Sequence, residues 1–253
     1  MKVYFIGAGP GDPELMTLKA RNVLEQAGAV IYAGSLVHPD CLKFVPAGVP
    51  RYDSSGMTLE EMVEVMVAEV RKNHIVARLH SGDASLYGAI AEQMRALDRH
   101  QISYEVIPGV SSFLAAAAAL KVELTVPAES QTVILTRAPG RTPVPERESL
   151  ASLAAHQATL CLFLSISQID QVAAELLTAY PPDTPAAVVY KVGWPEEKII
   201  SGPLAGIAGL AKQAGLTSTA LILVGDFLAR DGQPSRLYAG DFAHSFRGQK
   251  PCE

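Results

Sequence analysis

The sequence contains few of the residues that mark secreted or metal-binding proteins. Among its 253 residues are only three cysteines, scattered and odd in number: Cys41, Cys161 and Cys252. That spacing predicts neither a disulfide framework nor a CxxC metal site. The six histidines are also isolated from one another. We therefore expect a cytoplasmic protein without a metal site.

Long apolar runs and an excess of basic residues are absent as well. The longest fully apolar stretch, Phe113–Leu120, is far shorter than the ~20 residues of a membrane-spanning helix. The first residues pass directly into a strand-like KVYFI, without a signal-peptide pattern. The net charge of −5 argues against general nucleic-acid binding, which requires a basic face. We expect neither a membrane nor a nucleic acid as partner, but a local basic pocket for an acidic small molecule stays open.

Short apolar runs rich in β-branched residues alternate with helical patterns along the chain. This alternation predicts an α/β fold, with a mainly parallel sheet in the N-terminal half and a mixed sheet in the less regular C-terminal half. The runs that predict strands are Val3–Ile6, Val30–Ala33, Ile75–His80, Tyr104–Ile107, Thr132–Thr136, Thr159–Leu164, Ala187–Lys191 and Ala220–Val224.

One strong helical pattern and one change in composition refine this expectation. Residues 58–73 carry apolar side chains at helical spacing, and Thr58 with Glu61 fits a capping box. The composition changes at residues 123–131, after an alanine-rich segment. We therefore expect two α/β domains, residues 1–123 and residues 124–253.

Residues 5–20, FIGAGPGDPELMTLKA, begin with glycines spaced as in a dinucleotide-binding loop. That fingerprint also needs a glycine at its sixth position and an acidic residue at the end of the next strand. Here Asp12 holds the sixth position, and Ala33, Gly34 and Ser35 follow the next strand. Both requirements fail, which disfavours a nicotinamide oxidoreductase. A turn without a ligand, in which Asp12 caps a helix, stays open as an alternative.

Three predicted strands of the N-terminal half are each followed by glycines or other small residues. The three loops are Gly7–Gly11, Ser81–Gly88 and Pro108–Ser112. Ligands of open α/β sheets bind outside the carboxyl ends of the strands, and small residues let a ligand approach the backbone closely. The three loops together predict a small-molecule site.

The order of motifs is more specific than any single loop. GAGPGDPELMTLKA, VIYAGSLV, SGDASLYG, PGVSS and TSTALILVG follow one another over essentially the whole chain. This order resembles the tetrapyrrole methylase family, whose members use S-adenosylmethionine. The segments YAGSLV, YGAIAEQM, QTVILTRAPGRTPVPE and VVYKVGWPEEKI are most similar to the members that methylate C11 of precorrin-4 in cobalamin biosynthesis. One departure is Ala84, where the family usually has proline.

The resemblance implies a fold, a reaction and a set of contacts. It implies two α/β domains with the cofactor in the cleft between them, a homodimer, and methylation of precorrin-4 or its cobalt form at C11 to give precorrin-5. Carried over by motif, the cofactor contacts are Pro10, Ser81, Gly82, Asp83, Leu86, Ser111, Ser112, Leu164, Gly193 and Ala220.

A corrin precursor carries several carboxylates, so an acidic protein needs local basic groups to bind it. The segment TRAPGRTPVPERE places Arg137 and Arg141 in a Pro/Gly-rich loop after a strand, and these are the main candidates. Weaker candidates are Arg51, His80, His38 and Lys191.

No catalytic acid or base is predicted. Some family members carry an aspartate where this chain has Ala33, so we expect catalysis by orientation and by electron push from the tetrapyrrole itself. Two alternatives stay open: a sibling methyltransferase that acts at another carbon, and a binder of S-adenosylmethionine or tetrapyrrole without catalytic activity.

Overall fold

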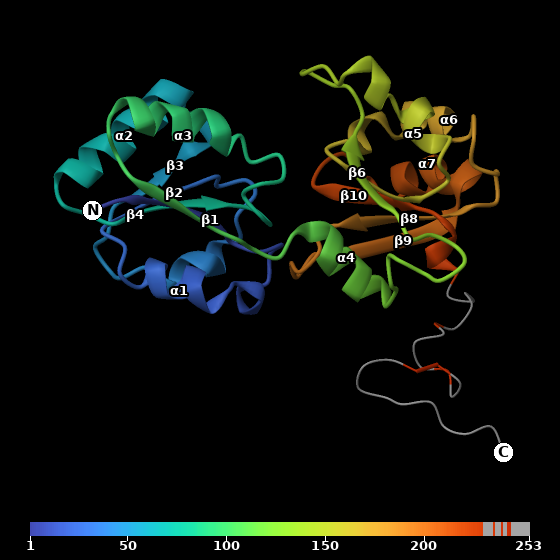
Figure 1. Ribbon diagram of the computed structural model, residues 1–253, viewed down its shortest axis with the longest axis horizontal. Helices are drawn as coiled ribbons and strands as arrows, with labels where there is room; N and C mark the ends of the chain where they lie inside the picture. Colours follow the sequence, from blue (N-terminus) through green and yellow to red (C-terminus); the bar gives the residue numbers. More distant parts are fainter. Residues whose placement is uncertain (230–234, 236–238, 240–241, 244–253) are drawn as a thin grey trace. The chain divides into compact units, whose positions relative to one another are not determined.

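In a computed structural model of the protein, residues 1–229, 235, 239, 242 and 243 are described. By their internal contacts they divide into two compact units (Figure 1). Met1–Ala119 and Tyr190–Lys198 form the first unit, and Leu120–Val189 with the residues from Ile199 onward form the second. The domain boundary between residues 123 and 124 stays a prediction, and Cys252 lies outside the described residues.

The first unit contains a five-stranded sheet. Its strands are β1 Val3–Gly7, β2 Ala29–Tyr32, β3 Arg51–Asp53, β4 Val76–His80 and β5 Tyr104–Ile107. They lie in the order β3-β2-β4-β1-β5, and the pairs of neighbouring strands run parallel, as the sequence predicts. Because β4, β1 and β5 are neighbours, their carboxyl ends lie side by side at one edge of the sheet.

Helices cover both faces of this sheet. α1 (Leu18–Leu24) lies on one face, whereas α2 (Leu59–Arg71) and α3 (Ile90–Arg99) lie on the other (Figure 1). Side chains alternate between the two faces along a strand, so Phe5 packs in the core beneath α2 and α3 while Ile6 packs in the core beside α1. Three short 3-10 helices complete the unit: η1 Pro13–Leu15, η2 Pro39–Phe44 and η3 Ser54–Gly56.

The second unit contains a mixed sheet. Its strands are β6 Val133–Arg137, β7 Thr159–Phe163, β8 Pro185–Tyr190, β9 Lys198–Pro203 and β10 Ala220–Val224. They lie in the order β6-β7-β10-β8-β9, with β6 parallel and β10 antiparallel to β7. The other elements of this unit are η4 Glu146–Glu148, α5 Leu150–Ala154, η5 Ile166–Gln168, α6 Ile169–Leu176, α7 Leu204–Gln213 and η6 Asp226–Leu228. α4 (Ser112–Leu120) belongs to the first unit up to Ala119. The mixed sheet confirms the prediction for this half.

The sequence misses two strands, β3 and β9. β3 has only the three residues RYD, and β9 (KIISGP) is exposed or half-buried along its length. Both are edge strands, so neither has the apolar run that marks a buried strand. The capping box of Thr58 and Glu61 at the start of α2 is confirmed. Within the described ranges, no helix has the length and apolar character needed to cross a membrane.

Candidate functional site

The three glycine-containing loops meet at the carboxyl edge of the first sheet, which we call the first edge. Gly9 and Gly82 exchange two backbone hydrogen bonds, with N···O distances of 3.1 and 2.7 Å. A Cβ atom on Gly7 would lie 2.6 Å from both the amide nitrogen of Gly109 and the carbonyl oxygen of Gly82. Only glycine permits such close approach of backbones. The three loops therefore pack against one another at this edge, while the small-molecule site that they predict stays a prediction.

Asp83 ties two of the loops of the first edge together. One carboxylate oxygen accepts a hydrogen bond from the backbone N–H of Gly109 at 2.8 Å, and the other accepts from the N–H and the hydroxyl of Ser85. Burial alone would raise the pKa of Asp83, but these hydrogen bonds outweigh it and hold the pKa below its ordinary value. The side chain thus stabilises the loops as a carboxylate.

Ser111, a predicted cofactor contact, and Ala84, the departure from the family pattern, lie in the same loops. The Cα of Ser111 is 3.5 Å from the position that a Cβ on Gly82 would take, and Ser111 is buried. Ala84 is buried as well, and its carbonyl oxygen lies 2.1 Å from where a Cβ on Gly88 would stand. The turn after Ala84 therefore closes tightly without the proline that the family usually carries there.

His80, the last residue of β4, lies beneath the first edge. It is 7% exposed, and its Nε2 atom has no hydrogen-bond partner among the described residues. Burial, helped by the positive charge of Arg78, lowers the pKa of His80 to about 3. Arg78 is itself buried, and its guanidinium donates to Gln93 Oε1 and to the carbonyl oxygen of Leu79, both at 3.3 Å. His80 is therefore a neutral imidazole near neutral pH.

The opening glycine loop is also contacted by residues from late in the chain. Gly193 adopts a left-handed backbone (φ 78°), and a Cβ there would lie 3.0 Å from the amide nitrogen of Asp12. The side chain of Asp12 accepts a hydrogen bond from the N–H of Glu14 at 2.8 Å and so caps η1, as expected for a helix start. The structure thus brings Gly193 to the loop that contains Pro10, a second predicted cofactor contact.

The weaker substrate candidates of the first unit are spread more widely. Arg51 begins β3, so it lies toward the amino ends of the strands, and its guanidinium donates to the carbonyl oxygen of Val45 at 3.3 Å. His38 caps η2 by accepting from the N–H of Asp40 at 3.2 Å. Arg51 is therefore not among the groups that the first edge brings together.

In the second unit, the predicted contacts gather at another edge of a sheet, which we call the second edge. β10 pairs antiparallel with β7, with Ile222 opposite Leu162, so Ala220 at the start of β10 and Leu164 directly after β7 lie at the same edge of the sheet. Leu164 has a left-handed backbone (φ 55°) and leaves 67% of its surface exposed, and Thr219 before Ala220 is also left-handed (φ 52°). Left-handed backbone in residues other than glycine is strained, and such strain is concentrated at binding sites.

Arg137 and Arg141 differ in what they do at the second edge. The Arg137 guanidinium donates to three carbonyl oxygens, those of Ala138, Thr142 and Pro143, at 2.8 to 3.3 Å. It therefore folds the loop that carries Arg141, whose own side chain is exposed. Ser165 anchors the same loop, because its hydroxyl accepts from the N–H of Ala138 at 2.7 Å.

Two features of the first unit are missed by the sequence reasoning. Asp53 pairs in register with Tyr32, and its carboxylate accepts from the N–H groups of Gly34 and Ser55. A carboxylate thus lies beside the end of β2 although the residues that follow β2 carry none. The second feature is Trp194, which packs on the opening loop. The position of Asp53 beside β2 follows from the register of β3, so it can be predicted only once β3 is recognised as a strand. Nothing in the local sequence indicates the packing of Trp194.

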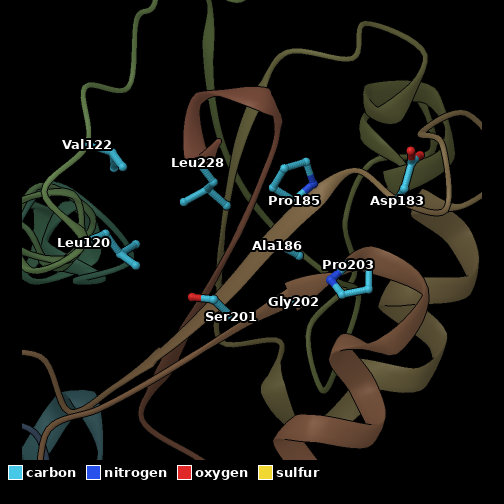
Figure 2. Close-up of a pocket in the computed structure, with 9 residues that line it drawn as sticks. All are labelled: Leu120, Val122, Asp183, Pro185, Ala186, Ser201, Gly202, Pro203 and Leu228. Carbon is cyan, nitrogen blue, oxygen red and sulfur yellow. The ribbon is translucent and has the colours of Figure 1, made fainter. Parts of the chain in front are cut away.

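The second unit also contains a cavity of about 450 Å³. It is lined by Leu120, Val122, Asp183, Pro185, Ala186, Ser201, Gly202, Pro203 and Leu228 (Figure 2). None of the predicted site residues lines it. Among the described residues that line it, Asp183 is the one charged side chain, so these residues offer no basic group to a substrate that carries several carboxylates.

The comparisons with known proteins agree with the resemblance seen in the motifs. The family described as Tetrapyrrole (Corrin/Porphyrin) Methylases matches residues 2–208. The cobalt-precorrin-4 C(11)-methyltransferase of Methanocaldococcus jannaschii is 50% identical over 248 residues, covering 97% of this chain and 96% of that protein.

Solved structures are similar over the same range. A cobalt precorrin-4 methyltransferase, a cobalamin biosynthetic enzyme, matches with a TM-score of 0.88 and 47% identity, covering 90% of this chain and 95% of that one. The uroporphyrin-III C-methyltransferase of Thermus thermophilus, in complex with S-adenosyl homocysteine, matches with a TM-score of 0.77 and 27% identity, covering 92% and 96%. With a family match over most of its length and half of its residues identical to a curated member, the chain belongs to the tetrapyrrole methylases.

Proposed function

We propose that the protein is an S-adenosylmethionine-dependent methyltransferase that methylates C11 of precorrin-4, or of its cobalt form, to give precorrin-5 in cobalamin biosynthesis. The observation that carries this proposal is the 50% identity, over 97% of the chain, to a curated cobalt-precorrin-4 C(11)-methyltransferase. The TM-score of 0.88 to a solved cobalt precorrin-4 methyltransferase supports the same reaction.

The groups at the first edge suit S-adenosylmethionine, which supplies an electrophilic methyl group when bound. The glycines keep the chain thin enough for backbone N–H and C=O groups to contact a ligand, and Ser112 begins α4, where the helix dipole favours a carboxylate. Asp83 acts through its backbone, because both of its carboxylate oxygens already accept hydrogen bonds. The proposed contacts in this unit are Pro10, Ser81, Gly82, Asp83, Leu86, Ser111, Ser112 and Gly193.

Leu164 and Ala220 are the proposed cofactor contacts in the second unit. The exposed side chain of Leu164 offers an apolar surface of the kind that packs against an adenine ring. Its left-handed backbone lies directly after β7, at the edge of the sheet where β10 begins with Ala220. Strain of this kind persists only where the surrounding structure imposes it, which supports a role in binding.

For the substrate, we propose that Arg141 pairs with a carboxylate of the tetrapyrrole. Its side chain is exposed on the loop that Arg137 folds, so Arg137 contributes to substrate binding through the position of this loop. His80 and Arg51 stay weaker proposals for the same role, since one is buried and the other lies away from the first edge.

The residues of this chain contribute to the reaction by binding and orientation. The carboxylates of Asp53 and Asp83 are poor general bases, because hydrogen bonds from backbone N–H groups help to hold the pKa of each below its ordinary value. His80 has a lowered pKa and is buried. Holding two reactants in a reactive geometry is itself worth several kcal/mol, about 7–11 in the best cases. We therefore assign no acid or base to the chain.

The experiment is methyl transfer from S-adenosylmethionine with a ¹³C-labelled methyl group to a panel of tetrapyrroles. The panel contains precorrin-4, cobalt-precorrin-4 and uroporphyrinogen III, and the position of the label is read by NMR. Label at C11 of either form of precorrin-4 supports the proposal. The form that is methylated at the higher rate is the preferred substrate. Label at another carbon supports the sibling methyltransferase.

Calorimetry distinguishes the remaining alternative, a binder without catalytic activity, by measuring the affinity for S-adenosylhomocysteine. Binding of S-adenosylhomocysteine without methylation of any member of the panel would support that alternative. Uroporphyrinogen III is the comparison substrate in the panel, because the Thermus thermophilus enzyme of similar structure is named as a uroporphyrin-III C-methyltransferase.

We also propose that the protein is a homodimer and is located in the cytoplasm. The first proposal rests on the family resemblance, and the second on the three scattered cysteines, whose spacing predicts no disulfide framework. Light scattering coupled to size-exclusion chromatography tests the first: the mass of two chains of 26.9 kDa is expected, and the mass of one chain would contradict it. Fractionation of the producing cell tests the second.

A further inference from the structure

A short segment from late in the chain packs against the loop near its beginning. We call residues Gly7–Asp12 the opening loop and residues Tyr190–Lys198 the late segment. The late segment connects β8 to β9, two strands of the second unit, yet its contacts place it in the first unit. A turn of two residues is enough to join two strands of a hairpin. The connection from β8 to β9 is longer than that, and its residues belong to the first unit by their contacts.

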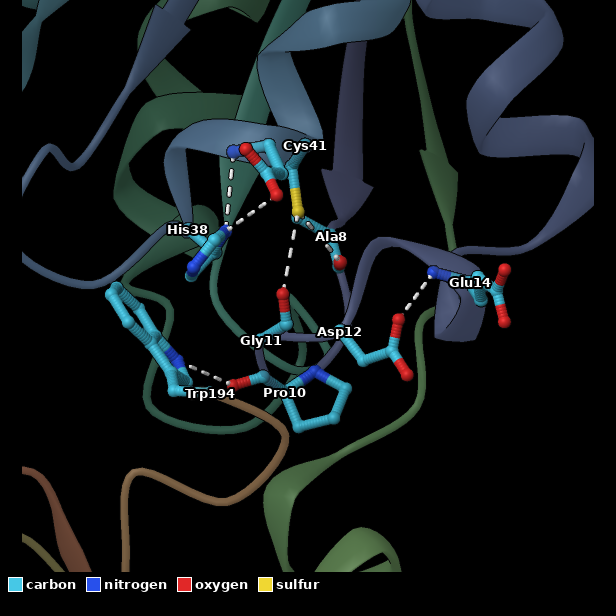
Figure 3. Close-up of polar contacts among 9 residues, drawn as sticks. Ala8, Pro10, Gly11, Asp12, Glu14, His38, Cys41 and Trp194 are labelled. Atoms are coloured by element: carbon cyan, nitrogen blue, oxygen red, sulfur yellow. Dashed lines mark hydrogen bonds and ion pairs between the residues drawn. The ribbon is translucent and has the colours of Figure 1, made fainter. Parts of the chain in front are cut away.

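Trp194 makes the main polar contact between the late segment and the opening loop. Its indole Nε1–H donates to the carbonyl oxygen of Pro10 at 3.1 Å, across 184 positions of sequence (Figure 3). An indole N–H only donates, so it fixes which side of the loop the carbonyl faces. In a trans peptide the N–H lies opposite the C=O, so the same bond also fixes the direction of the Gly11 N–H.

The fit between the indole and the opening loop is close. A Cβ on Gly11 would lie 2.2 Å from Cδ1 of Trp194, and a Cβ on Gly193 would lie 3.0 Å from the amide nitrogen of Asp12. Gly11 does not have a positive φ, so residues other than glycine could adopt its backbone conformation. The tightest constraint at Gly11 is thus the indole ring, since the next nearest group, the carbonyl oxygen of Gly193, would lie 3.0 Å from that Cβ. Gly11 and Trp194 therefore depend on each other.

Further groups hold Trp194 in this place. The ring of His38 packs edge-on against the indole with 4.5 Å between centroids, and Lys191 Nζ lies 4.9 Å from the centroid of the indole ring. Within the late segment, the carboxylate of Glu197 accepts from the N–H of Gly193 at 2.9 Å. Lys191 adopts a left-handed backbone (φ 44°), which places strain where the segment begins. On the opening loop, the thiol of Cys41 lies 3.8 Å from the carbonyl oxygen of Ala8.

We propose that Trp194 is a positioning residue for the cofactor: its indole N–H holds the peptide between Pro10 and Gly11 in the orientation in which the opening loop binds S-adenosylmethionine. This rests on the proposed function, in which Pro10 contacts the cofactor. The ring contributes packing against Gly11, and the N–H contributes orientation. Trp194 itself touches neither substrate nor cofactor in this scheme.

The test measures the affinity for S-adenosylhomocysteine by calorimetry in the intact chain, and KM and kcat for methyl transfer. Trp194→Phe keeps an aromatic ring and removes the donor. We expect a dissociation constant and a KM for S-adenosylmethionine about threefold to tenfold higher, which matches the loss of one hydrogen bond. We expect kcat at saturation to change less than about twofold, because the reacting groups are unchanged.

Tyr180→Phe is the matched control. The Tyr180 hydroxyl donates to the carbonyl oxygen of Ala158 at 2.6 Å, so this variant also removes one aromatic donor from a backbone acceptor, but in the second unit and away from the second edge. We expect it to lower stability and to leave the affinity unchanged. If Trp194→Phe loses stability as Tyr180→Phe does but binds S-adenosylhomocysteine as the wild type does, Trp194 is merely structural and the proposal is wrong.

A double-mutant cycle keeps the proposal testable if one substitution disturbs folding. Gly11→Ala forces the indole away while leaving it in the chain, and Trp194→Ala removes it. We expect each to weaken binding alone, and Gly11→Ala to have little further effect once Trp194 is alanine. Additive effects would contradict the coupling. Wild-type protein that fails to bind S-adenosylhomocysteine at all would instead overturn the proposed function.

Discussion

The first edge and the second edge achieve close packing of their loops by different means. At the first edge, the backbones of three loops touch at Gly7, Gly82 and Gly109, where a side chain would overlap backbone atoms. At the second edge, Leu164 and Thr219 take the left-handed backbone that glycine would adopt without strain. Arg137 then folds the neighbouring loop through hydrogen bonds to carbonyl oxygens.

The two edges therefore allow the role of glycine to be tested separately from the role of backbone strain. At the first edge, glycine leaves space for neighbouring backbone atoms, so we expect its substitution to lower the free energy of unfolding. At the second edge, residues with a left-handed backbone keep a side chain despite the strain. We expect their substitution by glycine to weaken ligand binding without lowering the free energy of unfolding. The following substitutions test this distinction, from the largest expected effect to the smallest.

Gly109→Ala is expected to have the largest effect. Its Cβ would lie 2.3 Å from the carbonyl oxygen of Gly82 and 2.7 Å from Cα of Gly7, and no flexible side chain can move aside. We expect the free energy of unfolding to fall by about 3 kcal/mol or more, or folding to fail. Urea denaturation gives the measurement.

Gly209→Ala is the control for that substitution. Gly209 lies within α7, and nothing is within 4 Å of a Cβ there. Alanine is the better helix former, so we expect stability to rise by about 0.5–1 kcal/mol. An unchanged urea midpoint for Gly109→Ala would contradict the idea that these glycines make room for neighbouring backbone.

The burial of His80 beneath the first edge predicts a dependence of stability on pH. The pKa of His80 is lowered to about 3 in the folded protein, whereas an unfolded histidine titrates near 6.5. As the pH falls from about 6.5 toward 3, the unfolded state gains a proton that the folded state does not, so stability is lost. The slope is up to about 1.4 kcal/mol per pH unit.

His80→Phe removes this titration. Between pH 6.5 and 4.5, we expect the wild type to lose about 2–3 kcal/mol more of its free energy of unfolding than the variant. The comparison is made above pH 4.5 because carboxylates such as Glu105, whose pKa is lowered to about 2 by hydrogen bonds from Lys19 and Lys2, add to the acid dependence below it. Parallel curves for the two proteins would show that His80 is protonated in the fold.

Leu164→Gly is expected to have opposite effects on stability and binding. Glycine relieves the left-handed backbone, so the free energy of unfolding is expected to rise by up to about 1 kcal/mol. Loss of the exposed apolar side chain is expected to weaken binding of S-adenosylhomocysteine about tenfold. Chemical denaturation and calorimetry give the two values.

Gln101→Gly provides the matched control for Leu164→Gly. Gln101 has the same backbone region (φ 57°), is exposed, and lies between α3 and β5 in the first unit, away from the carboxyl ends of the strands. We expect it to gain stability without any change in affinity. Equal affinities of the wild type, Leu164→Gly and Gln101→Gly for S-adenosylhomocysteine would mean that Leu164 does not contribute to cofactor binding.

The contrast between the edges also explains how far the sequence predicts the molecule. Glycine is visible in a sequence, so the three loops of the first edge and their meeting point follow from strand ends alone. The strands of the parallel sheet follow from buried apolar runs, and the capping box of Thr58 and Glu61 from its spacing. The motifs also suffice to indicate the tetrapyrrole methylases.

What the sequence does not predict depends on tertiary contacts. Leucine carries no local signal for a left-handed backbone, so the strain at Leu164 appears only in the structure. The sequence makes Arg137 a substrate ligand, whereas its guanidinium is engaged by three carbonyl oxygens of its own loop. The contact of Trp194 with Pro10 joins residues 184 positions apart, beyond the reach of any local pattern.

The most direct test of the account is a crystal structure of the protein with S-adenosylhomocysteine. We expect the ligand to contact Pro10, Gly82 and Ser111 at the first edge, with Trp194 still donating to the Pro10 carbonyl. A ligand bound with no contact to the first edge, for instance in the cavity lined by Leu120 and Asp183, would contradict it.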